Sequence, residues 1–106
     1  MKFARITTAT VPIEKIDEFT RVYEQFIPTA LKGVRGFEGV YLLNDRTMGE
    51  GLSLTFWASK EDAMAYEQSG LYMQLVEKLR PFFTKAPTLK SYEVPMELPV
   101  LATVPR

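Results

Sequence analysis

The reactive side chains open to this chain are those of tyrosine, tryptophan, arginine, lysine, asparagine and the carboxylates. Its 106 residues include no histidine and no cysteine. Histidine is the commonest general base and metal ligand, and cysteine supplies thiolate nucleophiles and disulfides. The composition therefore excludes Ser-His-Asp hydrolysis, two-histidine metal sites, cysteine-ligated metals and histidine-ligated haem. Any chemistry must use the remaining groups or the reactivity of the substrate itself.

The spacing of these remaining groups indicates structural roles in several places. The run Asn44-Asp45-Arg46 has the composition of a turn. The run Lys60-Glu61-Asp62 fits a solvated first helical turn, where the helix dipole favours carboxylates. The methionines do not have the spacing of a metal site, and they are better explained as gap-filling residues. None of these runs predicts a reaction.

The stretch from Gly36 to Gly70 predicts the elements that must position any site. Alternating segments at Phe37–Asn44 and Leu52–Trp57, joined by the turn NDRTMGEG, predict an antiparallel hairpin. Ser59 and Asp62 then have the spacing of a capping box, which begins a helix over about 60–68. Ser69-Gly70 breaks that helix, and a second helix follows and ends near Pro81.

The remaining segments complete an α+β pattern. Phe3–Thr10 predicts a first strand, and apolar steps of three and four from Ile13 to Val34 predict a helix that Pro28 should kink or split. Leu89–Val94 predicts a last strand. The order β-α-β-β-α-α-β predicts a four-stranded antiparallel sheet with helices on one face. We expect one domain over residues 1–95 and an extended C-terminal arm over 96–106.

Alternation along the strands divides their side chains between two faces. We expect Leu52, Leu54 and Phe56 to face the helices, and the opposite face to carry Arg5, Thr7, Ser53, Thr55 and Trp57. Phe3, Tyr41 and Trp57 would make that opposite face half apolar, so a second copy of the chain should cover it. Arg5 and Glu93 lie on predicted neighbouring strands, as either a structural ion pair or a proton-transfer couple.

Charge and hydropathy limit the partners. Thirteen basic and 13 acidic residues leave no net charge, so we expect no nucleic-acid partner. No run approaches the ~18 apolar residues of a membrane span, and the first residues lack the apolar centre of a signal peptide. We expect no membrane partner and a cytoplasmic location.

Three sequence features together resemble the antibiotic-biosynthesis-monooxygenase family, a branch of the dimeric α+β barrel superfamily. They are the pattern GF-x-G-x-x-L-L over Gly36–Leu43, the pattern apolar-W-x-S-x-E over Phe56–Glu61, and the Ser69-Gly70 break. The likeness extends over about residues 2–94. It implies a ferredoxin-like fold and a homodimer in which two sheets pair as a barrel. Members of the family include cofactor-independent oxygenases of aromatic polyketides, haem-degrading enzymes, small-molecule isomerases and proteins with no assigned activity.

The haem-degrading branch can be compared position by position. It requires an asparagine on the first strand, a tryptophan on the first helix after the hairpin and a histidine on the next helix. The corresponding positions fall near Ile6 or Thr7, at Tyr66 and at Val76. None of them matches, so we expect no haem ligated in that way and no other cofactor.

The oxygenase branch implies a different kind of site. There an electron-rich phenol or dihydroquinone supplies its own electrons to O₂, while the protein shields a pocket, orients the ring and helps to remove a phenolic proton. The resemblance gives Trp57, Tyr66 and Tyr72 as the nearest catalytic candidates. It also implies a small hydrophobic or aromatic ligand, bound on the helix side of the sheet by Ile6, Thr8, Phe26, Leu54, Phe56 and Val76.

Each aromatic candidate also has a structural explanation. A tryptophan at a strand end often packs against the following helix, and helix tyrosines often fill the core while their hydroxyls stay wet. Three hypotheses therefore stay open. The first is a cofactor-independent monooxygenase of a small aromatic or quinone-like metabolite. The second is a non-catalytic small-molecule-binding or structural dimer, and the third is an isomerase of a small oxygenated metabolite, which would need an acid–base pair.

Overall fold

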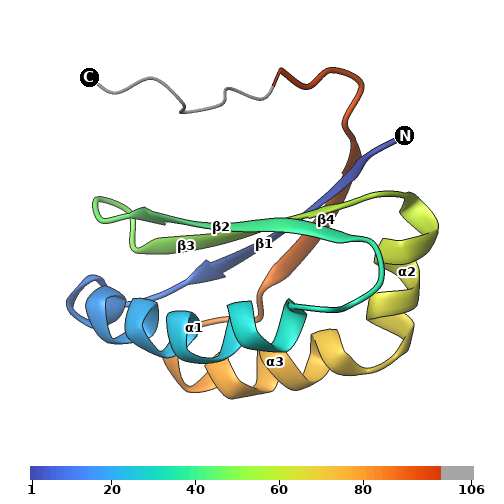
Figure 1. Cartoon of the computed structure of the whole chain (residues 1–106). Helices are drawn as coiled ribbons and strands as arrows, with labels where there is room; N and C mark the ends of the chain where they lie inside the picture. The colour runs from blue at the N-terminus through green and yellow to red at the C-terminus, as the bar shows by residue number, and fades with distance from the viewer. Residues whose placement is uncertain (99–106) are drawn as a thin grey trace, which may run out of the picture.

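A computed structural model describes residues 1–98 and confirms the predicted element order. In order along the chain, the elements are β1 (Phe3–Thr10), a 3₁₀ turn (Ile13–Lys15), α1 (Ile16–Leu31), β2 (Phe37–Asp45), β3 (Glu50–Trp57), α2 (Lys60–Gln68), α3 (Leu71–Leu79), a second 3₁₀ turn (Arg80–Phe82) and β4 (Thr88–Glu93). The strands form one antiparallel sheet in the order β2-β3-β1-β4. The helices lie on one side of it (Figure 1), which is the expected α+β ferredoxin-like fold.

Helix α1 supplies one wall of the core. Its residues Ile16, Phe19, Tyr23, Ile27 and Leu31 are buried, and their spacing places them on one face. The helix does not split at Pro28, as the sequence had suggested, but continues to Leu31. Burial of Ile27 and Leu31 on either side of the proline holds the last turn in place against the loss of one backbone hydrogen bond.

The start of α2 is fixed by the predicted cap. The backbone N–H of Asp62 donates a hydrogen bond of 3.1 Å to the Ser59 hydroxyl. The loop before β2 passes directly against this turn at Gly36, which has a φ of +80°. A Cβ atom at this position would overlap the Asp62 side chain. Glycine is therefore required both by the backbone conformation and by the close approach.

The strand register decides which residues share a face. Phe3 pairs with Trp57, Arg5 with Thr55 and Thr7 with Ser53. Trp57 is fully buried against Tyr66 of α2, so this set faces the helices. The prediction that it faces away from them is wrong. Ile6, Thr8, Leu54 and Phe56 occupy the alternate register positions and lie on the other face.

The reversed assignment has a simple physical reason. Alternation tells which side chains share a face, but it does not tell which face the helices cover. Both faces carry large apolar groups, so composition could not decide between them. In the structure Trp57 decides which face the helices cover, because its ring packs against α2. The ring centroid lies 4.8 Å from that of Tyr66 and 5.6 Å from that of Phe37.

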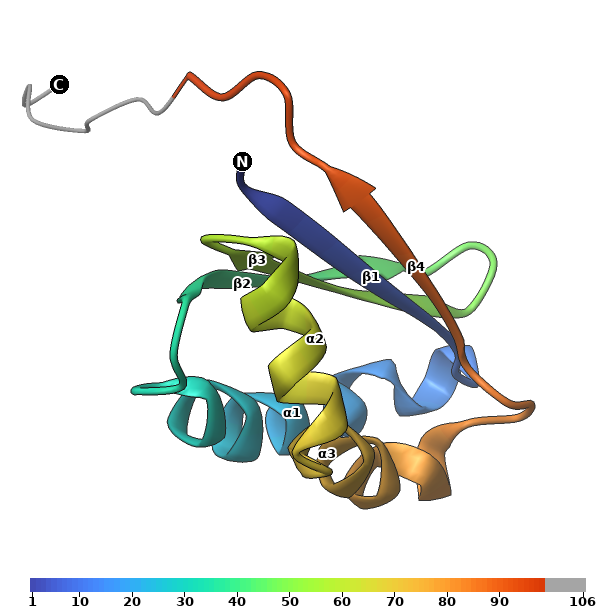
Figure 2. The same cartoon turned by 90° about the vertical axis from the view of Figure 1, so that its right-hand side faces the viewer.

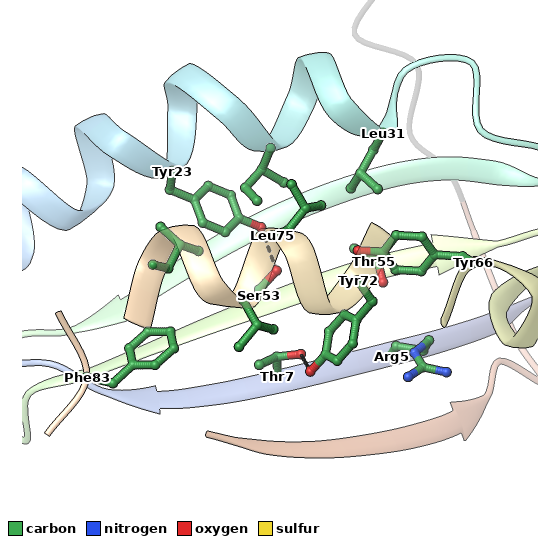
Figure 3. Close-up of a pocket in the computed structure, with 13 residues that line it drawn as sticks. Arg5, Thr7, Tyr23, Leu31, Ser53, Thr55, Tyr66, Tyr72, Leu75 and Phe83 are labelled. Atoms are coloured by element: carbon green, nitrogen blue, oxygen red, sulfur yellow. Dashed lines mark hydrogen bonds between the residues drawn. The ribbon is translucent and has the colours of Figure 1, made fainter. Parts of the chain in front are cut away.

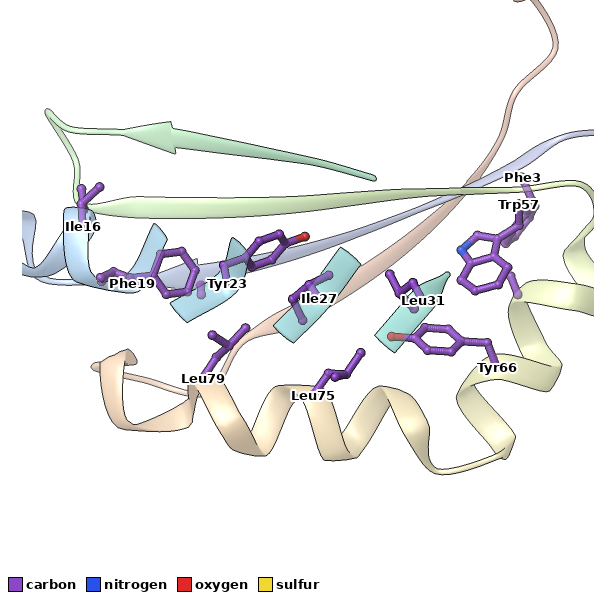
Figure 4. Packing of buried hydrophobic residues seen from close by; sticks show 13 residues of the cluster. Phe3, Ile16, Phe19, Tyr23, Ile27, Leu31, Trp57, Tyr66, Leu75 and Leu79 are labelled. Carbon is purple, nitrogen blue, oxygen red and sulfur yellow. The ribbon is translucent and has the colours of Figure 1, made fainter. Parts of the chain in front are cut away.

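The core lies between the sheet and the helices, as Figure 4 shows. At one end Phe19 packs against Phe82, with ring centroids 5.9 Å apart. A Cβ atom at Gly51 would come within 2.7 Å of the Phe19 ring, so α1 approaches β3 closely there. At the other end Trp57 and Tyr66 fill the space between β3 and α2. The middle of this layer contains the cleft described below.

The face of the sheet without helices is apolar and partly exposed. We call it the helix-free face; its large apolar residues are Ile6, Tyr41, Leu43, Leu52, Leu54, Phe56 and Tyr92. Tyr41 is 62% exposed, Leu43 48% and Tyr92 47%. The expectation of an uncovered apolar face therefore holds: Tyr41 lies on it as predicted, whereas Phe3 and Trp57 lie on the helix-covered face.

The chain after β4 turns toward the helix-free side of the sheet (Figures 1 and 2). Residues 94–98 have no regular secondary structure. The ammonium group of Lys2 joins this segment to the sheet, since its Nζ lies 2.6 Å from Glu97 Oε2 and 2.9 Å from Glu38 Oε1. The predicted arm covered 96–106, and its residues 99–106 lie outside the described part. Within residues 1–98, no helix has the length and apolarity needed to cross a bilayer.

Candidate functional site

A cleft of about 50 Å³ lies between the sheet and helices α1 and α3 (Figure 3). Its lining combines hydroxyl groups and one guanidinium with aliphatic side chains, namely Arg5, Thr7, Tyr23, Ile27, Leu31, Ser53, Thr55, Tyr66, Tyr72, Leu75, Val76, Leu79 and Phe83. In this conformation the cleft has room for about one or two water molecules. Arg5, Tyr66 and Tyr72 lie at one end of it and Phe83 at the other.

The structure brings only part of the predicted site together. Tyr66, Tyr72 and Val76 line the cleft as expected. Trp57 lies behind Tyr66 and does not line the cleft. Phe26 was expected in the pocket, but it is 39% exposed on the outer side of α1, where the Lys78 ammonium lies 4.6 Å from its ring centroid.

The other four predicted binding residues are not in the cleft. They belong to the helix-free face, as the strand register shows. Ile6 pairs with Leu54, Thr8 with Leu52 and Phe56 with Ala4. Their places in the cleft are taken by neighbours one position away, namely Arg5, Thr7, Ser53 and Thr55. The alternation had identified this second set as one group but had assigned it to the wrong face.

Two of the three cleft tyrosines have hydrogen-bond partners. The hydroxyl groups of Tyr72 and Thr7 are 3.0 Å apart and share a hydrogen bond across the cleft. The hydroxyl groups of Tyr23 and Ser53 share another. Tyr23 comes from α1 and was not among the site residues expected from the sequence. These two bonds tie both helices to the sheet.

The third tyrosine, Tyr66, differs from them. Its side chain is buried, and its hydroxyl makes no hydrogen bond to any residue within 1–98. Burial raises its pKa well above the usual value, and the neighbouring Tyr72 adds to that rise. The hydroxyl is therefore neutral at ordinary pH and keeps its proton available for donation.

Trp57 supports Tyr66 from behind. The indole and phenol rings stack with their planes inclined by 25°, and the indole N–H donates a hydrogen bond of 2.9 Å to Thr55 Oγ1. Trp57 has no exposed surface. Because its polar group is satisfied within the core, it positions Tyr66 and does not face the cleft.

Arg5 is the charged group of the cleft, and it does not pair with Glu93 as predicted. Residue Ser91 lies opposite Arg5 in the register, while Glu93 lies opposite Phe3. The Arg5 guanidinium instead lies 5.6 Å from the Tyr72 ring centroid, and its Nη2 is 3.0 Å from Glu67 Oε1. That ionic contact lacks hydrogen-bond geometry, so Nε and Nη2 are buried with no hydrogen-bond partner within residues 1–98.

A metal site is not formed by the described residues. No three acidic side chains of residues 1–98 gather closely enough to hold a metal ion. Of the positions compared with the haem-degrading branch, Thr7, Tyr66 and Val76 all line the cleft. The valine side chain offers no ligand atom, so these residues do not fit a haem held by a histidine at that position.

Comparison with known proteins decides the family. The family model described as antibiotic biosynthesis monooxygenase matches residues 2–78. The chain belongs to the antibiotic-biosynthesis-monooxygenase family. No curated protein sequence matches it. As a member of this family it carries the Gly36–Leu43 and Phe56–Glu61 patterns on β2, on β3 and at the start of α2.

Solved structures agree with this family fold. A monooxygenase from the gene ActVA-Orf6 of Streptomyces coelicolor, solved with nanaomycin D, is 14% identical with a TM-score of 0.77, covering 92% of each chain. SnoaB, a cofactor-independent oxygenase of Streptomyces nogalater, is 16% identical with a TM-score of 0.72, covering 93% of this chain and 98% of its own. The haem degrader MhuD of Mycobacterium tuberculosis is 20% identical with a TM-score of 0.75, covering 92% and 99%. At these identities the likeness shows the fold alone.

Proposed function

We propose that this family member is a cofactor-independent monooxygenase of a small aromatic or quinone-like metabolite. One observation carries the proposal: the hydroxyl of Tyr66 has no hydrogen-bond partner within residues 1–98, although its ring is buried beside the cleft. The hydroxyl keeps access to solvent at the cleft, so its O–H is free to donate to a ligand that enters there. Arg5 and Tyr72 lie at the same end of the cleft.

The proposed roles follow from protonation. Because burial raises the pKa of Tyr66, its hydroxyl is a hydrogen-bond donor at neutral pH and not a base. It would donate to the oxygen on which negative charge develops when the substrate gives up its phenolic proton. Tyr72 would flank the same ring, and Trp57 would hold Tyr66 in place.

The reaction needs no redox group from the protein. A reduced ring carbon bearing two hydrogens becomes a carbonyl carbon, one atom of O₂ enters that carbonyl, and the other leaves as water with the two hydrogens. The substrate supplies the electrons, so the site has to orient the ring, exclude bulk water and stabilise the substrate anion. The aliphatic wall formed by Ile27, Leu75 and Leu79 suits the second task.

An aromatic ligand requires the cleft to widen. Ligand pockets for such molecules enclose about 300 Å³ or more, whereas this one holds about 50 Å³. The hydrogen bond between Tyr72 and Thr7 closes the cleft from the α3 side. We propose that the ligand displaces this bond when it enters, with Tyr72 moving away from β1.

The homodimer belongs to this proposal as well. The helix-free face exposes Tyr41, Leu43 and Tyr92, together with part of the apolar surface of β1 and β3. A second copy of the same face would remove that surface from water, in a barrel of two sheets. The single-domain boundary at residue 95 and the cytoplasmic location stay predictions.

Oxygen consumption with dihydroxynaphthalenes and anthrones tests the function. We expect uptake above the enzyme-free autoxidation rate, and we expect Tyr66→Phe to lower the rate about tenfold or more, because it removes one donor to the developing anion. Tyr41→Phe, on the helix-free face, is the matched control and should leave the rate unchanged. Uptake at the autoxidation rate across the panel would contradict the proposal.

A non-catalytic small-molecule-binding or structural dimer is the second candidate, and the small cleft favours it. Val76 and Leu79 fill part of the space, and two of the three tyrosine hydroxyls are satisfied within the protein. Ligand binding without oxygen uptake would support this candidate. The isomerase has no comparable support, because no carboxylate or histidine within residues 1–98 lines the cleft to form an acid–base pair.

A further inference from the structure

The charge of the cleft points to the kind of ligand that it takes. Arg5 is 4% exposed, lines the cleft, and has two buried nitrogens with no hydrogen-bond partner within residues 1–98. A guanidinium taken out of water needs acceptors for its N–H groups, and leaving them unsatisfied destabilises the fold. A structural ion pair with hydrogen-bond geometry would satisfy these N–H groups, and the contact between Arg5 and Glu67 does not.

Glu67 balances the charge of Arg5 only weakly. Its carboxylate approaches Nη2 to 3.0 Å without hydrogen-bond geometry, and 47% of its side chain is exposed. Water screens such a carboxylate, so its attraction for the guanidinium is reduced. No aspartate or glutamate within residues 1–98 lines the cleft to offset it. The lining of the cleft therefore carries one charged group, the Arg5 guanidinium, within a largely apolar wall.

The positions of the unsatisfied nitrogens narrow the ligand further. Nε and Nη2 lie on one edge of a guanidinium, and that edge pairs in parallel with two neighbouring oxygens that share a negative charge. Both atoms are covered in this conformation, with the Tyr72 ring centroid 5.6 Å from the guanidinium, so the ligand reaches this edge when Tyr72 moves away from β1. We propose that Arg5 binds the ligand through such an oxygen pair, as a carboxylate or as an ionised hydroxyl beside a carbonyl on the same ring. The inference rests on the proposed function only in taking this cleft as the ligand site. Arg5 then binds the anionic form of the substrate, and no protein base has to carry the proton away.

Matched ligand pairs test this inference without oxygen. The probes are 2-hydroxy-1,4-naphthoquinone, which is ionised at neutral pH, and its neutral methyl ether, together with 2-naphthoate and its methyl ester. Calorimetry under anaerobic conditions measures binding alone. We expect the wild-type protein to bind the charged member of at least one pair about tenfold or more tightly than the neutral member. If the naphthoquinone probes show the preference, Arg5 binds an ionised hydroxyl beside a carbonyl. If the naphthoate probes show it, Arg5 binds a carboxylate.

Three variants locate the preference. Arg5→Met should abolish it, whereas Arg21→Gln, on the exposed side of α1, should retain it. Glu67→Gln should strengthen binding of the charged member a few-fold, because it removes the carboxylate that competes for Nη2. Arg5→Met should also keep its melting temperature within about 5 °C of the wild type, since it removes unsatisfied buried groups.

Several outcomes would overturn the inference. They are equal binding of charged and neutral members, no binding of either, a preference that survives Arg5→Met, and an Arg5→Met protein that does not fold. The outcomes distinguish this inference from the oxygenase proposal. An Arg5-dependent preference in a protein that consumes no oxygen leaves this inference standing and ends the proposed reaction. Oxygen uptake whose rate and KM are the same in the wild type and in Arg5→Met would support the oxygenase proposal and overturn this inference.

Discussion

The phenol ring of Tyr66 stacks on the indole of Trp57, with ring centroids 4.8 Å apart. The two rings join the core to the cleft, because Trp57 has no exposed surface and Tyr66 lines the cleft. A change at Trp57 can therefore reach the cleft through the position of Tyr66 or through its hydrogen bond to Thr55, which also lines the cleft. The family resemblance implied both residues as catalytic candidates, but they have different roles in the structure.

Trp57→Phe should lower stability more than it lowers chemistry. The smaller ring leaves a cavity in a fully buried place, and Thr55 Oγ1 loses the hydrogen bond from the indole N–H. We expect the free energy of unfolding to fall by about 2–3 kcal/mol. The chain has a single tryptophan, so urea unfolding should be followed by far-ultraviolet circular dichroism. A variant with wild-type stability would show that the indole is not a core residue.

The helix-free face should control self-association. Leu54 lies opposite Ile6 and Tyr41 in the register, in the middle of that face. Leu54→Glu would bury a carboxylate in a dimer interface, at a cost of about 3 kcal/mol or roughly a hundredfold in the dissociation constant. Sedimentation equilibrium measures this directly. Met73→Glu, on an exposed side chain of α3, is the control and should leave the dimer intact. A wild-type protein that sediments as a monomer at micromolar concentration would refute the dimer itself.

Two glycines separate backbone strain from steric overlap. Gly33 has a φ of +86° and Gly36 a φ of +80°, so both adopt the left-handed conformation. Only at Gly36 would a Cβ atom meet another residue, the Asp62 side chain. Gly33→Ala should cost about 1 kcal/mol from the left-handed conformation alone. Gly36→Ala should cost more, because the start of α2 must also shift. Denaturation midpoints of both variants give the comparison, and equal losses would show that the turn of α2 adjusts freely.

Stability should fall at alkaline pH through Tyr66. Burial raises its pKa in the folded protein above the ordinary value of 10.0, so the folded state holds the phenolic proton more tightly than the unfolded chain. Its contribution is thus fully present below about pH 10 and is lost as the pH rises toward the folded-state value. Tyr23 shifts in the same direction through burial. Urea midpoints of the wild type should stay level up to about pH 9.5 and drop from there to about pH 12, and Tyr66→Phe should flatten that drop. An identical drop in both proteins would show that Tyr66 titrates normally.

Local patterns in the sequence were enough to predict the elements. Apolar spacing placed α1, the Ser59-Asp62 cap placed the start of α2, and β-branched residues placed β1 at Phe3–Thr10. Each of these signals depends on residues close in the chain, whose preferences act before any tertiary contact forms. The family resemblance rested on the same local patterns, and the family model confirms it.

By itself, then, the sequence determined the element order, the α+β class and the exclusion of histidine and cysteine chemistry. Only the tertiary structure decided which face of the sheet the helices cover, and with it the identity of the cleft residues. Arg5 and Ile6 are adjacent in the chain, yet one faces the cleft and the other the helix-free face. A strand with bulky groups on both faces satisfies alternation equally well either way, and the choice falls to long-range packing of Trp57 against Tyr66 of α2.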